Sequence, residues 1–189
     1  MQHAFRAAAT LAVIAAPAAY AASAFAPTKI AQGPGHVTAI AQWEIQSSAK
    51  AQQGGAEISS GGFSTKDWYP VSGRATVMAG LLENGKYKDV FHDDNLRAVG
   101  VPDAGHHRFV IPWWYRGEFT LAPGAHGRHV LLRTNGIIGG ADLWLNGRRV
   151  AARPQLRGAY PVHEFDVTQW VKGGANTLAL RVHPADPQR

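Results

Sequence analysis

Residues 133–150 read RTNGIIGGADLWLNGRRV, and the second half of this stretch predicts a β-hairpin. Leu143 and Leu145 fall two residues apart, as on the buried face of a strand. The pair Asn146-Gly147 follows, and a type I′ turn needs a positive φ at both central residues, which Asn and Gly tolerate. Because a lone hairpin is only marginally stable in water, this hairpin is expected to belong to a larger β-sheet.

Other stretches also have strand character and are separated by Gly- and Pro-containing turns: residues 37–47, 109–121, 129–134, 159–167 and 177–183. The last of these alternates cleanly. Leu178 and Leu180 are expected to face the core, whereas Ala179 and Arg181 are expected to face solvent. Short strands in close succession predict an all-β fold, an antiparallel jelly-roll β-sandwich.

A single short helix is predicted at residues 75–83. Its apolar residues repeat on one helical face: Val77, Met78, Leu81 and Leu82. Ser72 is expected to cap the N-terminus, and Gly85 is expected to end the helix. Residues 47–62 and 87–105 are predicted to be loops, and a loop as long as the second is usually functional or disordered.

Residues 1–26 have the form of a secretory signal peptide, in which Arg6 precedes a short alanine-rich apolar run. Two patterns suited to signal-peptide cleavage follow: Ala19-Tyr20-Ala21 and Ala22-Ser23-Ala24. The protein is therefore predicted to be secreted or periplasmic; the alternative is an N-terminal amphipathic helix that is not removed. Residues 27–36 are expected to form a linker, and residues 37–189 the β-sandwich domain.

The composition excludes several classes of protein. Hydrophobic residues make up 46% of the chain, which fits a globular protein with its own core. The net charge is +6, but no run of like charge exceeds two residues, so no nucleic-acid partner is predicted. With no cysteine, disulfides and thiolate metal sites are excluded. After the leader no stretch is apolar enough to span a bilayer, so no membrane partner is predicted.

Two histidine-containing stretches are candidates for metal ligands: His106-His107 and His92-Asp93-Asp94. Neither has a third ligand at a recognisable spacing. No metal or other cofactor is therefore predicted.

Several motifs in order along residues 40–184 resemble a known family: Pro112-Trp113-Trp114-Tyr115-Arg116 with Phe119, Asn135-Gly136-Ile137, Ala141-Asp142-Leu143-Trp144-Leu145-Asn146-Gly147, His163-Glu164-Phe165-Asp166-Val167-Thr168 and Gly174-Ala175-Asn176-Thr177-Leu178. The chain resembles the N-terminal, galactose-binding-like β-sandwich of glycoside hydrolase family 2. The branch it is most similar to contains the exo-β-D-glucosaminidases and β-mannosidases.

The resemblance implies a larger, retaining β-glycosidase in which an immunoglobulin-like domain and a TIM barrel follow the sandwich. In that family the barrel carries the two catalytic glutamates, and a barrel alone takes about 250 residues. None of the glutamates here lies in a catalytic motif, so no catalytic residue is predicted. The chain is expected to be a fragment, a truncated gene product or a standalone module without hydrolytic activity of its own.

By the same resemblance, the loop after the short helix reaches the barrel's substrate pocket. Asp94 and Asn95 are therefore candidates for contacts with sugar hydroxyls. Relatives usually carry proline after the aspartate that matches Asp89, whereas Val90 stands here. The alternative is simple turn chemistry, because Asp and Asn favour loops.

Trp113, Trp114 and Tyr115 are the second group of candidate substrate-binding residues, because aromatic rings stack on the C–H faces of sugars. Alternation places Trp113 and Tyr115 on one face of the strand and Trp114 on the other, so one of these faces is core. The alternative is that most of this aromatic surface packs in the core or against another domain.

Three functions remain open from the sequence. The first is the non-catalytic N-terminal sandwich of a secreted exo-β-D-glucosaminidase that acts on chitosan oligosaccharides, supporting the barrel and lining its pocket. The second is a standalone module that binds a β-linked amino-sugar or mannose oligosaccharide. The third is a scaffold without a ligand. A glucosamine oligomer is cationic like this domain, so any attraction to it must be local.

Overall fold

The computed structural model describes residues 23–31, 33, 35–73, 75–87, 89–92, 95–99, 109–122 and 129–185. Its strands are β1 (Thr28–Lys29), β2 (Gln42–Ser47), β3 (Tyr69–Ser72), β4 (Trp113–Leu121), β5 (Leu131–Thr134), β6 (Ile138–Leu145), β7 (Arg148–Ala151), β8 (Arg157–Ala159), β9 (His163–Asp166) and β10 (Gly174–His183). Its helices are α1 (Gly55–Ile58), α2 (Val77–Glu83) and α3 (Asn95–Val99).

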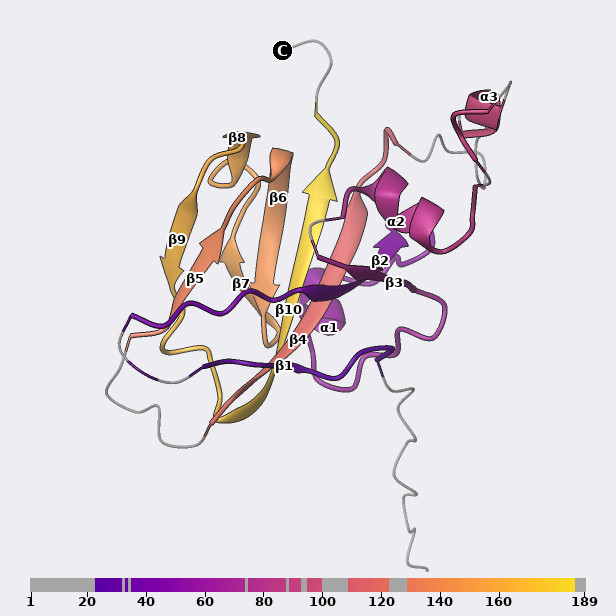
Figure 1. Ribbon diagram of the computed structural model, residues 1–189. Coiled ribbons are helices and arrows are strands. Elements are labelled where there is room, and N and C mark those ends of the chain that lie inside the picture. The colour runs from indigo at the N-terminus through magenta and orange to yellow at the C-terminus, as the bar shows by residue number, and fades with distance from the viewer. Residues whose placement is uncertain are drawn as a thin grey trace, which may run out of the picture.

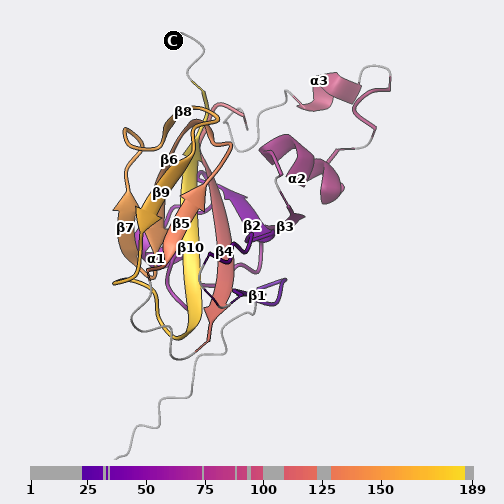
Figure 2. The ribbon, with the colours of Figure 1, turned by 60° about the vertical axis from the view of Figure 1, so that its left-hand side comes forward.

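The strands form two sheets, arranged as shown in Figure 1. The larger sheet has the order β3-β2-β4-β10-β6-β7, and β8 pairs with β6. The smaller sheet contains β5 and β9 and lies against one face of the larger sheet, as the turned view in Figure 2 shows. All of these pairs are antiparallel except β1 with β4, which is parallel. The predicted antiparallel β-sandwich is confirmed.

The core between the sheets is built on the hairpin predicted from the sequence. Asn146 and Gly147 have φ angles of 51° and 84°, as a type I′ turn requires, and they join β6 to β7. Leu143 and Leu145 are fully buried, together with Leu178 on the neighbouring β10. The prediction of a tight hairpin inside a larger sheet is therefore confirmed.

The side chain of Asn146 ties this turn to the rest of the domain. Its Nδ2 donates to the Trp170 carbonyl and to Asn176 Oδ1, each at 2.8 Å. Its Oδ1 accepts the backbone N–H of Thr177 at 3.0 Å. Asn146 therefore supplies the positive φ of the turn and also links the turn to β10.

Strand β10 is covered on both faces, so the prediction that Ala179 faces solvent was wrong. Ala179 is 0% exposed and packs in a second cluster with Ala51, Ile58 and Trp114. The cause is α1, which lies in the segment predicted to be a loop and covers the outer face of β10 and β6. A pattern of alternating residues does not reveal that the outward face is covered.

Helix α1 approaches the sheet closely because Gly55 has no side chain. A Cβ at Gly55 would overlap the indole ring of Trp144, whereas a Cβ at the adjacent Gly54 would meet nothing within 4 Å. We expect Gly55→Ala to lower the free energy of unfolding by about 1–3 kcal/mol, as overpacking does, and Gly54→Ala to leave it nearly unchanged. Urea unfolding of both variants tests this, and equal losses would contradict it.

Three short helices are described where one was predicted, and the predicted one is capped differently. Thr76, not Ser72, caps α2, because its side chain accepts the N–H of Ala79. Ser72 lies in β3 instead and donates its hydroxyl to Glu83 Oε1 at 2.7 Å, which ties the end of α2 to the strand. Among the described residues, none of the helices has the length and apolar character needed to cross a bilayer.

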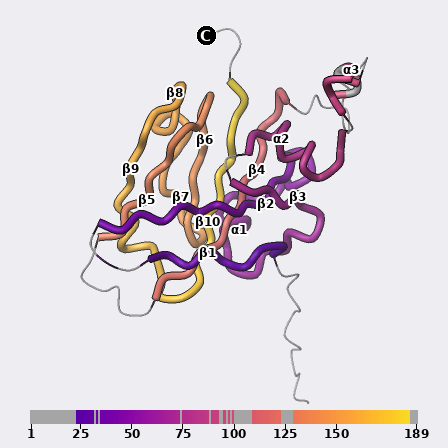
Figure 3. The backbone as a smooth tube through the Cα atoms, viewed as in Figure 1, coloured from indigo at the N-terminus to yellow at the C-terminus, as the bar shows by residue number. Residues whose placement is uncertain are grey.

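Several predicted boundaries also differ. The strand expected over residues 159–167 is two strands, β8 and β9, separated at Tyr160, whose φ is 58°. The strand expected over residues 37–47 begins only at Gln42. Part of the segment 27–36, predicted to be a linker, belongs to the larger sheet, because β1 pairs with β4. Figure 3 traces the chain from β1 outward and back into β2.

Candidate functional site

The excursion that contains α2 and α3 lies to one side of the sandwich, and α3 is at its outer end (Figures 1 and 2). The turn before α3 is held by the backbone of Asp89, whose carbonyl accepts the His92 N–H at 3.1 Å and Asn95 Nδ2 at 2.9 Å. Val90 and Val99 are buried, whereas Phe91 is 94% exposed. The excursion thus buries two apolar side chains and presents a large one outward.

Asn95, the first of the predicted sugar contacts, lies on this excursion. It begins α3 within the segment predicted to be a loop, and its side chain is exposed. Its hydrogen bond to Asp89 shows that it also has the turn role that was the alternative. Asp94, the other candidate, lies outside the described residues. A contact between either residue and a sugar remains a prediction.

In the aromatic row on β4, Trp113 and Trp114 are buried and Tyr115 is partly buried. Trp113 is buried in a cluster with Ile45 and Val71, and Tyr115 packs against the same cluster. Trp114 points the other way, is 2% exposed, and donates its Nε1–H to the Ala51 carbonyl at 3.1 Å. The predicted division of the three rings between two faces is therefore seen.

Neither face of this row offers an open ring platform, because protein covers both. Burial raises the pKa of Tyr115 to about 12, and its hydroxyl donates to the Ala75 carbonyl at 3.2 Å. The indole of Trp114 lies 5.3 Å from that of Trp144, centroid to centroid. Stacking of a sugar on Trp113, Trp114 or Tyr115 remains a prediction, and the burial of the two tryptophans counts against it.

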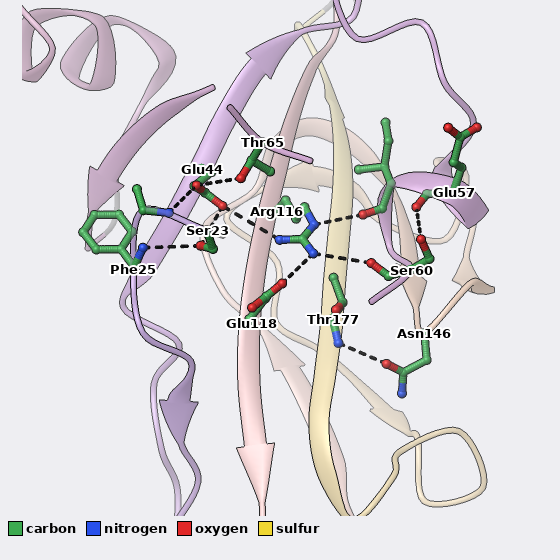
Figure 4. A network of polar contacts seen from close by, with 12 residues as sticks. Ser23, Phe25, Glu44, Glu57, Ser60, Thr65, Arg116, Glu118, Asn146 and Thr177 are labelled. Carbon is green, nitrogen blue, oxygen red and sulfur yellow. Dashed lines mark hydrogen bonds and ion pairs between the residues drawn. The ribbon is translucent and has the colours of Figure 1, made fainter. Parts of the chain in front are cut away.

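The sequence reasoning missed a buried polar network beside this row, shown in Figure 4. Arg116 on β4 is 1% exposed and donates Nε–H to the Ile58 carbonyl at 3.1 Å. Its Nη2 lies 2.5 Å from Glu118 Oε1, and its Nη1 lies 3.8 Å from Glu44 Oε2. Alternation along β4 places Trp114, Arg116 and Glu118 on one face of the strand. This pattern is the sequence signal that could have revealed the network.

A small hollow with a volume of about 10 Å³, the space of about one water molecule, adjoins this network. The residues that line it come from the N-terminal segment, β2 and β4: Ser23, Phe25, Ala26, Gln42, Trp43, Glu44, Arg116, Gly117 and Glu118. Ligand pockets for drug-sized molecules usually hold about 300–1,000 Å³. The hollow is too small for an oligosaccharide, and its charged groups already bind one another.

A second charged cluster lies where β6 and β10 run side by side. Asp142 accepts a hydrogen bond from Arg149, lies 2.9 Å from His183 Nε2, and accepts the Arg153 N–H at 3.0 Å. Burial raises the pKa of Asp142, but these hydrogen bonds together outweigh burial and hold that pKa below its ordinary value. The cluster joins β7 and the following turn to the central strands.

Asp166 ends β9 and binds the turn that follows. Its Oδ1 accepts the Thr168 hydroxyl at 2.5 Å and the Thr168 N–H at 3.0 Å, and its Oδ2 lies 2.7 Å from His129 Nδ1. The Thr168 hydroxyl, the Thr168 amide and His129 together lower the pKa of Asp166 to about 2.

This shift predicts a measurable acid dependence of stability. Because the folded-state pKa lies below the ordinary value of about 4, the carboxylate stabilises the fold above about pH 4. That contribution is lost as the pH falls toward about 2. We expect Tm to fall less steeply between these two pH values in Asp166→Asn than in the unaltered chain. Parallel slopes in thermal melts of the two proteins would contradict the assignment.

Within the part of the chain that the structure describes, no three His, Cys, Asp or Glu side chains are placed to hold a metal ion. Of the histidine stretches considered from the sequence, His106-His107 and Asp93-Asp94 lie outside the described residues.

The comparisons with known proteins agree with this architecture. Residues 43–188 match the family model described as the glycosyl hydrolase 2 galactose-binding domain-like family. The chain belongs to this family. As a family 2 domain, it is 42% identical over 183 residues to the exo-β-D-glucosaminidase of Amycolatopsis orientalis, which covers 97% of this chain and 17% of that protein. It is 37% identical over 167 residues to the exo-β-D-glucosaminidase of Arthroderma benhamiae, covering 87% and 18%.

Two solved structures share the fold of this family 2 domain. The crystal structure of the exo-chitosanase from Amycolatopsis orientalis matches 82% of this chain and 17% of that chain, with a TM-score of 0.74 and 42% identity. A β-D-mannosidase from Dictyoglomus thermophilum matches with a TM-score of 0.54 at 20% identity, which shows the shared fold alone. The chain thus spans less than a fifth of the length of these relatives.

Proposed function

We propose that this chain works as the non-catalytic N-terminal β-sandwich of a family 2 exo-β-D-glucosaminidase. The observation that carries the proposal is the 42% identity along 97% of the chain to an exo-β-D-glucosaminidase of which it matches only 17%. In this proposal the rest of such an enzyme supplies the immunoglobulin-like domain and the barrel, and β-linked glucosamine oligosaccharides are the substrate.

The described carboxylates support a non-catalytic role. Retaining glycoside hydrolysis uses two carboxyl groups about 5 Å apart, one as acid/base and one as nucleophile. Glu44 and Glu118 both face the same guanidinium, that of Arg116, and Glu44 is 3% exposed. Carboxylates that are paired with a buried arginine, one buried and one partly exposed, are suited to hold the sandwich together and not to attack a sugar.

The excursion around α3 is the part of the domain that we propose lines the substrate pocket. It lies off the sandwich, buries Val90 and Val99, and presents exposed Phe91 and Asn95. In the proposal, Asn95 gives hydrogen bonds to a sugar hydroxyl while its link to Asp89 keeps the turn in shape. The sandwich itself supports the barrel through its outer surfaces.

A chimaera tests the proposal. The segment of the Amycolatopsis orientalis exo-β-D-glucosaminidase that matches this chain is replaced by residues 23–188 of this protein, so that β1 and the whole of β2 are kept. We expect the folded chimaera to hydrolyse p-nitrophenyl-β-D-glucosaminide, and the 189-residue chain alone to be inactive. A chimaera that folds but hydrolyses no faster than the enzyme without its N-terminal segment would refute the proposal.

The same chimaera tests the role of the excursion. We expect Asn95→Ala to lower kcat/KM about tenfold, because a hydrogen bond to a sugar hydroxyl is worth roughly 1 kcal/mol and the turn would also loosen. Asn135→Ala is the matched control, since Asn135 is an exposed asparagine in the connection between β5 and β6. If both variants keep full activity, the excursion does not line the pocket, although the domain assignment stands.

Export is the second part of the proposal. It is supported by the leader-like sequence of residues 1–26 and by the absence of cysteine, which leaves the folded core independent of the redox state of the compartment. Recovery of the protein from the culture medium or periplasm of an expressing bacterium would support export. Retention of the uncut chain in the cytoplasm would contradict it.

A further inference from the structure

We infer that the leader is cut after Ala21 and not after Ala24, so that Ser23 and Ala24 remain as working parts of the folded domain. The inference rests on the export proposed above. Both bonds follow a small-x-small pattern, so the leader pattern alone does not choose between them. The contacts of Ser23 and Ala24 with the sandwich favour the first bond, because a cut there keeps hydrogen-bond donors that the folded domain uses.

The contacts converge on Glu44, a carboxylate on β2 that is only 3% exposed. Its Oε2 accepts the Ser23 hydroxyl at 2.8 Å, and its Oε1 accepts the Ala24 N–H at 2.8 Å (Figure 4). The other hydrogen bond to Oε1 comes from the Thr65 hydroxyl at 2.9 Å. Two of these three donors therefore belong to the segment that a cut after Ala24 would remove.

The lost hydrogen bonds from Ser23 and Ala24 would affect Glu44, a side chain that is almost fully buried. Without Ser23 and Ala24, the partner that Glu44 Oε2 keeps among the described residues is Arg116, whose Nη1 lies 3.8 Å away, beyond hydrogen-bond distance. The cut would exchange two direct hydrogen bonds to the carboxylate for bonds to water, and it would expose the ion pair with Arg116 to solvent screening. Glu118 faces the same guanidinium, so two carboxylates share one cation, and the neutral donors matter more.

The residues that follow bind the sandwich as well. Ser23, Phe25 and Ala26 line one wall of the hollow, and the Phe25 N–H donates to the Ser23 hydroxyl at 3.3 Å. The chain then enters β1, where Thr28 pairs with Phe119 of β4. Ser23 is thus the first described residue of a continuous segment that packs on β2 and β4, and a cut after Ala21 leaves the segment whole.

The first experiment reads the N-terminus of the full chain after export from a bacterial host, by intact mass and Edman sequencing. We expect the exported protein to begin at Ala22. A protein that begins at Phe25 would overturn the inference while leaving export intact. An uncut chain that begins at Met1 and stays in the cytoplasm would overturn both export and the cut.

Paired variants locate the cut independently, because cleavage needs a small residue immediately before the bond. Ala21→Leu should abolish the product that begins at Ala22, whereas Ala24→Leu should give that product as the unaltered chain does, since Ala24 is exposed and accepts a larger side chain. The opposite result would overturn the inference.

A stability measurement tests the role of the retained residues. Ser23→Ala should lower the Tm of the exported protein by about 4 °C, because one hydrogen bond to a buried carboxylate is lost. Ser64→Ala is the matched control, an exposed serine between α1 and β3, and should leave Tm unchanged. Equal melting temperatures for Ser23→Ala and the control would show that Glu44 does not need this segment.

Discussion

Replacing Arg116 with alanine is expected to lower the free energy of unfolding by about 3–5 kcal/mol, the usual loss when one partner of a buried ion pair is removed. Arg116 is 1% exposed, and its guanidinium donates to the backbone carbonyls of Ile58 and Ser60 while it faces Glu44 and Glu118. The alanine variant would leave Glu44 buried without a counter-charge. It would also release the end of α1 from the sheet. Urea unfolding followed by tryptophan fluorescence measures the loss.

Two further variants separate charge pairing from a general effect of removing arginine. Arg148→Ala removes an exposed arginine from β7 and should change the stability by less than about 0.5 kcal/mol. Arg116→Met combined with Glu44→Gln removes both charges, and it should recover part of the loss because no buried charge is left unpaired. If Arg116→Ala costs no more than Arg148→Ala, the network does not stabilise the sandwich.

The parts of the fold that the sequence predicts well are those set by local rules. The hairpin between β6 and β7 follows from two residues, Asn146 and Gly147, because few other pairs adopt two successive positive φ angles. Period-two alternation placed Leu143 and Leu145 in the core, as it did Leu178 on β10. Such features depend on neighbours in the chain and are visible in a short window of sequence.

The parts that were missed depend on contacts between distant segments. Nothing in the sequence near Ala179 shows that α1 covers it, since Gly55 and Trp144 meet across nearly ninety positions. Thr76 caps α2 in place of the predicted Ser72, because Ser72 is held in β3 by its pairing with Gln42. Tertiary contacts overrode local preference in each case.

At the candidate site, too, the features set by local sequence were predicted and the contacts between distant segments were missed. Alternation correctly separated Trp113 and Tyr115 from Trp114, but it does not state which faces are covered, and both are. The sequence placed Arg116 in a family motif but did not predict its buried ion pairs. The role of a charged residue in an aromatic strand depends on which carboxylates lie next to it in the fold. Glu44 lies on β2, more than seventy positions away.

Trp114→Ala is expected to destabilise the domain by about 3–5 kcal/mol, the range for removing a large aromatic side chain from a core. The indole is 2% exposed, packs beside Trp144 and under Arg181, and donates its Nε1–H to the Ala51 carbonyl. Its removal leaves a cavity between α1 and the sheet and an unpaired carbonyl in the loop. Calorimetric melts of the purified protein measure the change.

Phe91→Ala is the contrasting variant, because that ring is 94% exposed on the excursion and its loss should change stability by less than about 0.5 kcal/mol. The contrast decides how sugar-binding experiments are interpreted. If Trp114→Ala melts far below the unaltered chain, lost binding in that variant reports unfolding and says nothing of stacking. If it melts within a degree or two of Phe91→Ala, the indole is not part of the core, and a role as a sugar platform regains support.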